Sequence, residues 1–489
     1  WKPPAHSPEE NMVRQKCSGI RRSYLGQYLP GYFAITVNSA TDFINMSEQD
    51  YSTLVHEYIH FLQNISTVSG LTILSCIGAW VGHLTHGIYN NKESEGGIRC
   101  FPYYGENSDS STIIENFDSI IISLYGNGEN KGLNILSDKY GVTKVTLSPF
   151  SDNVLFDEIT PMPERLKYSS RCLVEYAYLT TQGNSIQVPN ITVDVGAICI
   201  YEYMAFTIEK HLFGTVGEPP KTPYLVVKDV ADFIFGYEVN DDILVAICEL
   251  TLQSPFPGEE LYKILNNLNE KGYAINSMDK RSLSECCDSI YYIQEDYDIL
   301  ESGSTDSDGE FKEYSKKMLL NRQIEEVKKD FKVFFDGNPD FDKAYDALVY
   351  LLDAMSNFSG DDLMPISEMM FLEKKVAFDY LNDIIKLIGM PLLFNENGYV
   401  GHAIAAKGCD EQFFLFYTLY QYIRIFKYGD ESCGLLHSCK NFQIQCVNEN
   451  CQSNPRLKGK EELLCTLGQL IKVWGLNNYD FIKSRTGNS

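Results

Sequence analysis

Residues 47–65 read SEQDYSTLVHEYIHFLQNI, with the pattern HEYIH at positions 56–60. At about 100° per residue, the apolar side chains of this stretch fall on one broad arc and most of its polar side chains on the other, as in an amphipathic helix. Ser47 followed by Asp50 is close to a capping box, and acidic side chains in the first turn suit the positive end of a helix dipole. The sequence therefore predicts a helix over about 47–65.

On such a helix, His56 and His60 lie one above the other and can bind one metal ion, while Glu57 stands beside them. A coincidental polar face, exposed to solvent, is the alternative. The apolar flanks instead predict a helix inside the domain, where two imidazoles and a carboxylate need partners. We expect a zinc site with His56 and His60 as ligands and Glu57 as the general base.

HEYIH on an amphipathic helix resembles the zinc-dependent metallopeptidases called zincins. The resemblance covers about twenty residues and a second helix within a chain of 489 residues. Gln63 and Ser66 occupy the positions where the metzincin branch has a Gly and a third His, so that branch does not fit. The resemblance implies an α+β fold: a zincin-like catalytic domain with a small sheet and active-site helices that hold Zn²⁺.

A third ligand is expected on a second helix over about 195–212, which begins VGAICIYEYMAFTIE. Asp194 could cap this helix, and Glu202 is the one charged residue between Asp194 and Glu209. A buried carboxylate is costly unless a cation or hydrogen-bond donors meet it, and zinc with two histidines usually takes one more protein ligand. These residues predict Glu202 as the third ligand.

The pattern Glu-x-x-Ala at Glu202 and Ala205 also resembles the third-ligand helix of the gluzincin branch. The long interval between the two helices then requires an insertion, at about residues 90–193. Three alternatives stay open: Glu115 as ligand, Glu209 as ligand, or an ordinary buried Glu202 paired with a basic residue. Basic neighbours of Glu209 suggest a solvated helix end.

Short strands are expected around the two helices. Residues 31–37, GYFAITV, are rich in aromatic and β-branched residues and predict a strand. The zincin resemblance implies an edge strand here, which could hold an extended peptide by strand addition, whereas an internal strand is the alternative. Further strands are expected at 144–147 and 173–179, followed by a hairpin turn at 182–185.

Residues 214–223, GTVGEPPKTP, form the best domain boundary by composition. We expect a zincin-like metallopeptidase domain over 1–214 and a mainly helical, substrate-selecting or regulatory region over 224–489. The helices predicted in the second region span 230–253, 259–269, 312–335, 341–356, 366–388, 411–427 and 460–474.

Composition narrows the classes of partner. Hydrophobic residues make up 44% and charged residues 22% of the chain, as in globular proteins. A formal net charge of −25 disfavours nucleic acid and anionic membrane surfaces, and no uninterrupted apolar run reaches the length of a membrane span. Fourteen scattered cysteines do not resemble a disulfide framework, so a reducing, cytoplasmic location is expected.

One group of cysteines stands out near the C-terminus: Cys433, Cys439, Cys446 and Cys451, with His437 among them. Five potential soft ligands could hold a structural zinc. Their spacing lacks the short C-x2-C pairs typical of such sites, so free thiols or local disulfides are the alternative.

The function that these residues favour is zinc-dependent endopeptidase activity on a polypeptide substrate, with a protein regulator as a further possible partner. His402 or Tyr203 could stabilise the tetrahedral oxyanion. The alternatives are a non-catalytic binding or scaffold protein with a structural metal, and a zinc hydrolase of a non-peptide amide.

Overall fold

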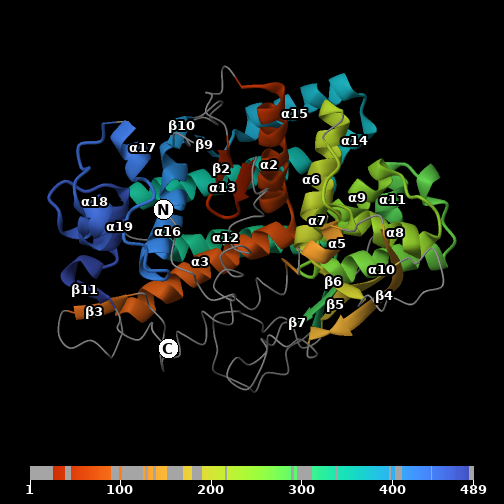
Figure 1. Ribbon diagram of the computed structural model, residues 1–489, viewed down its shortest axis with the longest axis horizontal. Helices are drawn as coiled ribbons and strands as arrows, with labels where there is room; N and C mark the ends of the chain where they lie inside the picture. Colours follow the sequence, from red (N-terminus) through yellow and green to blue (C-terminus); the bar gives the residue numbers. More distant parts are fainter. Residues whose placement is uncertain are drawn as a thin grey trace.

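The protein is an α+β protein in which small sheets flank a body of helices (Figure 1). The expected fold class is therefore confirmed at this level. The computed structural model describes residues 26–38, 46–89, 98–101, 125–126, 130–135, 139–150, 169–178, 190–214, 217–287, 291–294, 311–335, 339–395, 398–401, 410–441 and 443–483.

The motif stretch forms helix α2, Glu48–Ser66, and the Ser47 side chain caps it by accepting a hydrogen bond from the Asp50 backbone N at 3.1 Å. Both the helix and its cap were predicted from the sequence. After a single connecting residue, the chain enters α3, Val68–Tyr89. Helix α12, Lys316–Phe335, packs along α3 (Figure 1), and α13, Pro339–Ser359, contacts α2, so the C-terminal half contributes helices around the motif helix.

Helix α3 is the most apolar long helix near the site. Its residues Val68–Ile88 are long and apolar enough to cross a membrane by length and composition, with 78% of the most apolar window buried inside the protein. Burial against α2 and α12 accounts for this composition, because a helix covered on most sides is apolar on most sides.

The first sheet has the strand order β1-β2-β9-β10 and joins distant parts of the chain. Its strands are β1 Gly26–Leu29, β2 Ala34–Val37, β9 Leu392–Asn395 and β10 Gly398–Gly401. β2 pairs antiparallel with β1 and parallel with β9, so it is an internal strand, the second of the two alternatives. The edge strand beside α2 is β1, which the sequence did not predict.

The expected strand over 31–37 begins only at Ala34. Gly31 has φ +73° and Phe33 has φ +48°, so residues before Ala34 form the turn between β1 and β2. Left-handed backbone of this kind ends a strand, and glycine adopts it without steric cost. The turn brings β1 back against α2.

A second sheet leads into the other site helix. It consists of β4 Tyr140–Pro149, β5 Ser170–Tyr178 and β6 Ile191–Val195, paired antiparallel in that order. The predicted strands near 144–147 and 173–179 match β4 and β5, whereas the hairpin turn at 182–185 lies outside the described residues.

Helix α6, Ala197–Phe213, follows β6 directly and corresponds to the predicted helix over 195–212. The expected cap was wrong: Gly196 is the N-cap residue, and Asp194 stays in β6, with a carboxylate oxygen 3.6 Å from Arg171 Nη1. The reason is close backbone packing. A Cβ on Gly196 would lie 2.5 Å from the Gly126 backbone N, so only glycine fits at this junction.

The C-terminal half is mainly helical, as expected, but two predicted helices are interrupted. The stretch 230–253 forms α8, Val226–Phe235, and α9, Asp241–Leu252, because Gly236 adopts φ +70° and ends α8. The stretch 366–388 likewise forms two helices, α14, Glu368–Phe371, and α15, Lys374–Ile388. The remaining elements are α5 Lys131–Ile135, α7 Lys221–Tyr224, α10 Pro257–Glu270, α11 Lys280–Cys286, α13 Pro339–Ser359, α14 Glu368–Phe371, α15 Lys374–Ile388, α16 Asp410–Phe426, α17 Leu436–Asn441, α18 Asn450–Ser453, α19 Thr466–Val473, β3 Ile98–Phe101, β7 Tyr291–Gln294, β8 Phe311–Tyr314, β11 Asp480–Lys483 and the 3₁₀ helices η5 Ile275–Ser277, η6 Pro455–Lys460 and η7 Leu476–Asn478.

One hydrophobic core includes side chains from both sides of the boundary expected at 214–223. The first sheet also takes two strands from each side. The division into 1–214 and 224–489 stays a prediction, and the two regions share this core.

Candidate metal centre

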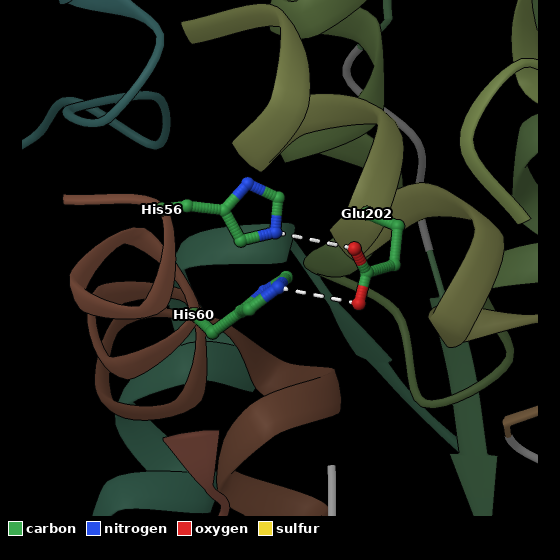
Figure 2. A group of neighbouring side chains, drawn as sticks. All are labelled: His56, His60 and Glu202. Carbon is green, nitrogen blue, oxygen red and sulfur yellow. Dashed lines mark hydrogen bonds and ion pairs between the residues drawn. The ribbon is translucent and has the colours of Figure 1, made fainter. Parts of the chain in front are cut away.

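Three side chains from two helices converge inside the protein: His56 and His60 on α2, and Glu202 on α6 (Figure 2). One ligand atom of each lies within 4.8 Å of the others. His56 Nε2 is 3.2 Å from Glu202 Oε2, and His60 Nε2 is 3.4 Å from Glu202 Oε1. The structure thus brings together the three side chains that the sequence predicts as ligands, in a group that could hold a metal ion.

The two helices are held together by polar contacts as well as apolar packing. Ser52 Oγ on α2 donates to Glu209 Oε1 on α6 at 2.5 Å, and Gln63 Nε2 on α2 donates to the Tyr201 backbone O at 3.2 Å. These contacts lie one turn before His56 and near His60, so they fix the spacing between α2 and α6 on both sides of Glu202.

The other ring nitrogen of each histidine has an oxygen partner. His56 Nδ1 is 2.9 Å from Glu209 Oε2, and His60 Nδ1 is 2.8 Å from Gln63 Oε1. Gln63 Nε2 already donates to Tyr201 O, so its Oε1 must accept from the ring. Both imidazoles therefore carry a proton on Nδ1, as metal-bound histidines with a supporting acceptor do.

With Nδ1 protonated, the neutral imidazoles each direct an Nε2 lone pair at the Glu202 carboxylate. Acceptors facing one another need a positive charge between them, either further protons or a metal ion. His60 Nε2 is buried and forms no hydrogen bond, since its 3.4 Å approach to Glu202 is an ion-pair distance without hydrogen-bond geometry. A tetrahedral ion with bonds of about 2.0–2.2 Å separates its ligand atoms by roughly 3.3–3.6 Å, which is close to the two histidine–glutamate distances. The three ligand atoms together lie within 4.8 Å, so they would draw closer around a shared ion.

The electrostatics of Glu202 favour its charged form. Burial by itself raises the pKa of this carboxyl, but the imidazole rings of His60 and His56 next to it outweigh burial and hold the pKa well below its ordinary value. An ionised, buried carboxylate between two imidazoles suits a cation.

Glu57 lies beside the three ligands and lines a small cavity with two of them. The cavity has a volume of about 30 Å³, enough for one or two water molecules. Glu57 is 2% exposed, and its Oε2 accepts a hydrogen bond from the Tyr28 backbone N of β1 at 2.7 Å. The cavity is lined by Tyr28, Pro30, Glu57, His60, Asn64, Ile73, Tyr125, Ile198, Tyr201 and Glu202.

Two residues, Tyr203 and His402, were expected to stabilise an oxyanion. The Tyr203 hydroxyl donates to Asp241 Oδ1 at 3.0 Å, and Tyr203 does not line the cavity. His402 lies outside the described residues. Two phenols that the sequence did not indicate, Tyr28 and Tyr201, do line the cavity.

No sequence signal singles out Tyr28, because it belongs to the unpredicted strand β1. Tyr201 precedes Glu202 on the expected ligand helix, so a position near the site could be predicted for it. Tyr203, which follows Glu202, was an equally good candidate by sequence. In the structure, Tyr28 OH donates to Asn64 Oδ1 at 2.9 Å and Tyr201 OH to Ser69 Oγ at 3.2 Å.

The expectation that Glu209 lies at a solvated helix end was wrong. Glu209 is fully buried, because α14 and α15 pack against this part of α6. It supports His56 through Nδ1 and does not join the three converging ligand atoms. The other alternative, Glu115, lies outside the described residues.

Comparisons of the chain with protein-family models, with curated proteins and with solved structures give no match.

Proposed function

We propose that the protein is a zinc-dependent hydrolase that cleaves peptide bonds, with Glu57 as general base. The observation that carries the proposal is the convergence of two Nε2 lone pairs and one carboxylate within 4.8 Å, beside a cavity that Glu57 also lines. A general base must reach the proton that it abstracts, and Glu57 lines the same cavity as His60 and Glu202.

The donor set suits zinc. Two imidazole nitrogens and a carboxylate oxygen are one of the usual three-ligand sets of catalytic zinc, which keeps a further position for water. Carboxylate and imidazole ligands also bind other divalent metals, so the identity of the ion belongs to the proposal.

When bound, the ion would lower the pKa of a water toward about 7 and polarise the scissile carbonyl. Glu57 would act as the general base for a water in the cavity that it lines, and would pass the proton to the leaving amine. Its Oε2 is held by Tyr28 N, which orients the carboxylate towards the cavity. Tyr28 or Tyr201 can donate to the developing oxyanion once its hydroxyl leaves its present acceptor.

The experiment compares Glu57→Gln with the parent protein. The variant should retain its zinc, because Glu57 is not among the converging ligands, and should lose cleavage by about 10²–10⁴-fold. New peptide termini are measured by mass spectrometry after incubation with a proteome. Glu48→Gln, an exposed change in the first turn of the same helix, is the matched control and should cleave like the parent. Equal cleavage by the Glu57→Gln variant and the parent would remove Glu57 from the mechanism.

A hydrolase of a small non-peptide amide is the second candidate, because a cavity of about 30 Å³ holds water but not an extended peptide. Zinc binding with no new termini from the proteome, together with Glu57-dependent hydrolysis of small amides, would favour this candidate. Zinc binding with neither activity would favour the scaffold alternative.

The polypeptide substrate, a regulatory role for 224–489 and a cytoplasmic location remain parts of this proposal. The structure adds one constraint to them. Residues of the C-terminal half complete the sheet beside α2, through β9 and β10, so this sheet connects that half with β1.

A further inference from the structure

One face of α2 holds strand β1 through two buried polar side chains, Glu57 and Asn64. They lie seven residues apart in the sequence, which places them two turns apart on the same face of the helix. A Cβ on Gly26 would lie 2.6 Å from Thr53 Cγ2 and 3.0 Å from Glu57 Oε1. Because Gly26 has no side chain, β1 lies directly against this face of α2.

Tyr28 of β1 is attached to both of these side chains. Its backbone N donates to Glu57 Oε2 at 2.7 Å, and its hydroxyl donates to Asn64 Oδ1 at 2.9 Å. The ring between these two points is buried and packs edge-on against Phe61, with ring centroids 6.1 Å apart. A phenol ring is rigid, so a hydroxyl fixed by Asn64 restricts where the backbone N of Tyr28 can lie.

Asn64 also holds the turn that follows β1. Tyr32 N donates to Leu29 O at 3.2 Å, and Gly31 has φ +73°, as in a turn with Pro followed by Gly. The hydrogen bond that closes this turn does not use the N–H of Gly31. That buried N–H needs another acceptor, and it donates to Asn64 Oδ1 at 3.0 Å. One amide oxygen therefore fixes both Tyr28 and the turn.

The orientation of the Asn64 amide is fixed from its other side. Asn64 Nδ2 donates to the Gly70 backbone O of α3 at 2.9 Å, so Oδ1 must face β1. The side chain is 4% exposed. An amide is the group that this position requires, because it accepts from β1 and donates to α3 at once. A carboxylate here would face the Gly70 carbonyl without a proton to donate, and an aliphatic side chain would bond to neither.

We propose that Asn64 is a positioning residue for Glu57. It fixes Tyr28 through the hydroxyl and through the turn at Gly31, and the Tyr28 backbone N then holds the Glu57 carboxylate in its place beside the cavity. Glu57, Asn64 and Tyr28 all line this cavity. The use of Glu57 as general base rests on the proposed function, whereas its attachment to Asn64 through Tyr28 does not.

The first experiment measures amide hydrogen exchange in the full chain, by mass spectrometry with residue-level fragmentation. In Asn64→Ala, the amides of Gly31 and Tyr28 should exchange at least about tenfold faster than in the parent, although Glu57, the acceptor for Tyr28 N, is unchanged. The amide of Ile366, which donates to the buried carboxylate of Glu249, is the internal reference and should keep its rate. An unchanged rate at Tyr28, or equal acceleration at Ile366, would overturn the proposal.

Asn64→Ala could fail to fold, so Tyr28→Phe provides a milder test of the same link. This change removes the hydroxyl that Asn64 binds and keeps the backbone N that Glu57 binds. The amide at position 28 should again exchange faster. Tyr422→Phe is the matched control, because it removes a buried hydroxyl that contacts Thr85 Oγ1, and it should leave that amide at the parent's rate. A parent-like rate at position 28 in Tyr28→Phe would contradict positioning through the phenol.

Cleavage of a proteome connects this positioning to the proposed reaction. Asn64→Ala should retain zinc, because Asn64 is not among the converging ligands, and should lower cleavage about tenfold. Adding Asn64→Ala to Glu57→Gln should cause no further loss, because both changes act on one carboxylate. A further tenfold loss in the double variant would contradict positioning through Glu57. Absence of cleavage by the parent would overturn the proposed function, while the exchange rates would still decide the role of Asn64.

Discussion

At the scale of single residues, Glu209 links the two helices that carry the candidate metal ligands. Its carboxylate accepts from Ser52 Oγ and from His56 Nδ1, and it is fully buried. A carboxylate behind a ligating histidine fixes the ring orientation and makes Nε2 a better donor to a metal. Glu209 thus acts on the centre through His56.

We expect Glu209→Gln to weaken zinc binding by about 10–100-fold, because a neutral amide is a poorer acceptor for the His56 Nδ1 proton. Competition with a chromophoric chelator measures the change. Glu175→Gln, on β5 and away from both helices, serves as control and should leave affinity unchanged. Unaltered zinc affinity in the Glu209→Gln variant would show that this carboxylate holds only the helices together.

At the scale of elements, the crossing of α2 and α3 depends on one glycine. A Cβ on Gly70 would lie 2.4 Å from the Gln63 backbone O and 2.5 Å from Asn64 Cα. These are backbone atoms of the last turns of α2, so neither can move aside as a flexible side chain would. The same turns carry Gln63, the acceptor for His60.

Gly70→Ala should therefore lower the free energy of unfolding by about 1–3 kcal/mol, the usual cost of overpacking, and weaken zinc binding as well. Denaturant unfolding of the zinc-free protein isolates the first effect. Gly217→Ala, where no atom lies within 4 Å of the added Cβ, is the control and should be close to neutral. An unfolding midpoint equal to that of the control would mean that the two helices can separate without cost.

At the scale of the whole molecule, Glu249 joins α9 to the segment that precedes α14. Its Oε1 accepts from Ile366 N at 2.9 Å and its Oε2 from Ser367 N at 2.6 Å. Burial raises the pKa of this carboxyl from 4.5 to about 7, although these hydrogen bonds and the charge of Lys280 lower it. The folded protein therefore holds the Glu249 proton more tightly than the unfolded chain does.

Glu249 should make stability fall as pH rises. Between pH 4.5 and about 7 the unfolded chain releases this proton while the folded protein keeps it, so the free energy of unfolding declines across this window and then levels off. Glu249→Gln removes the titration. The free energy of unfolding of the parent minus that of the variant should therefore decrease as pH rises from 4.5 to about 7. Denaturant unfolding of both proteins across this pH range measures that quantity. If the parent's free energy of unfolding minus the variant's increased with pH, the raised pKa of Glu249 would be contradicted.

Much of the candidate centre was predictable because its information is local. The spacing of His56, Glu57 and His60 places all three by helical periodicity alone, and the Ser47 cap marks where that helix begins. Glu202 was predictable for a related reason: a lone charge within an apolar helix must meet a partner.

Tertiary structure decided what local pattern leaves open. Glu202 and Glu209 lie on the same side of α6, and only the position of α6 beside α2 assigns one to the Nε2 atoms and the other to His56 Nδ1. The partners of Glu57 and of Cys433, namely Tyr28 and Cys451, were likewise hidden. Helical periodicity depends on residues three or four apart, whereas these contacts depend on how whole helices and strands pack, which no short stretch of sequence encodes.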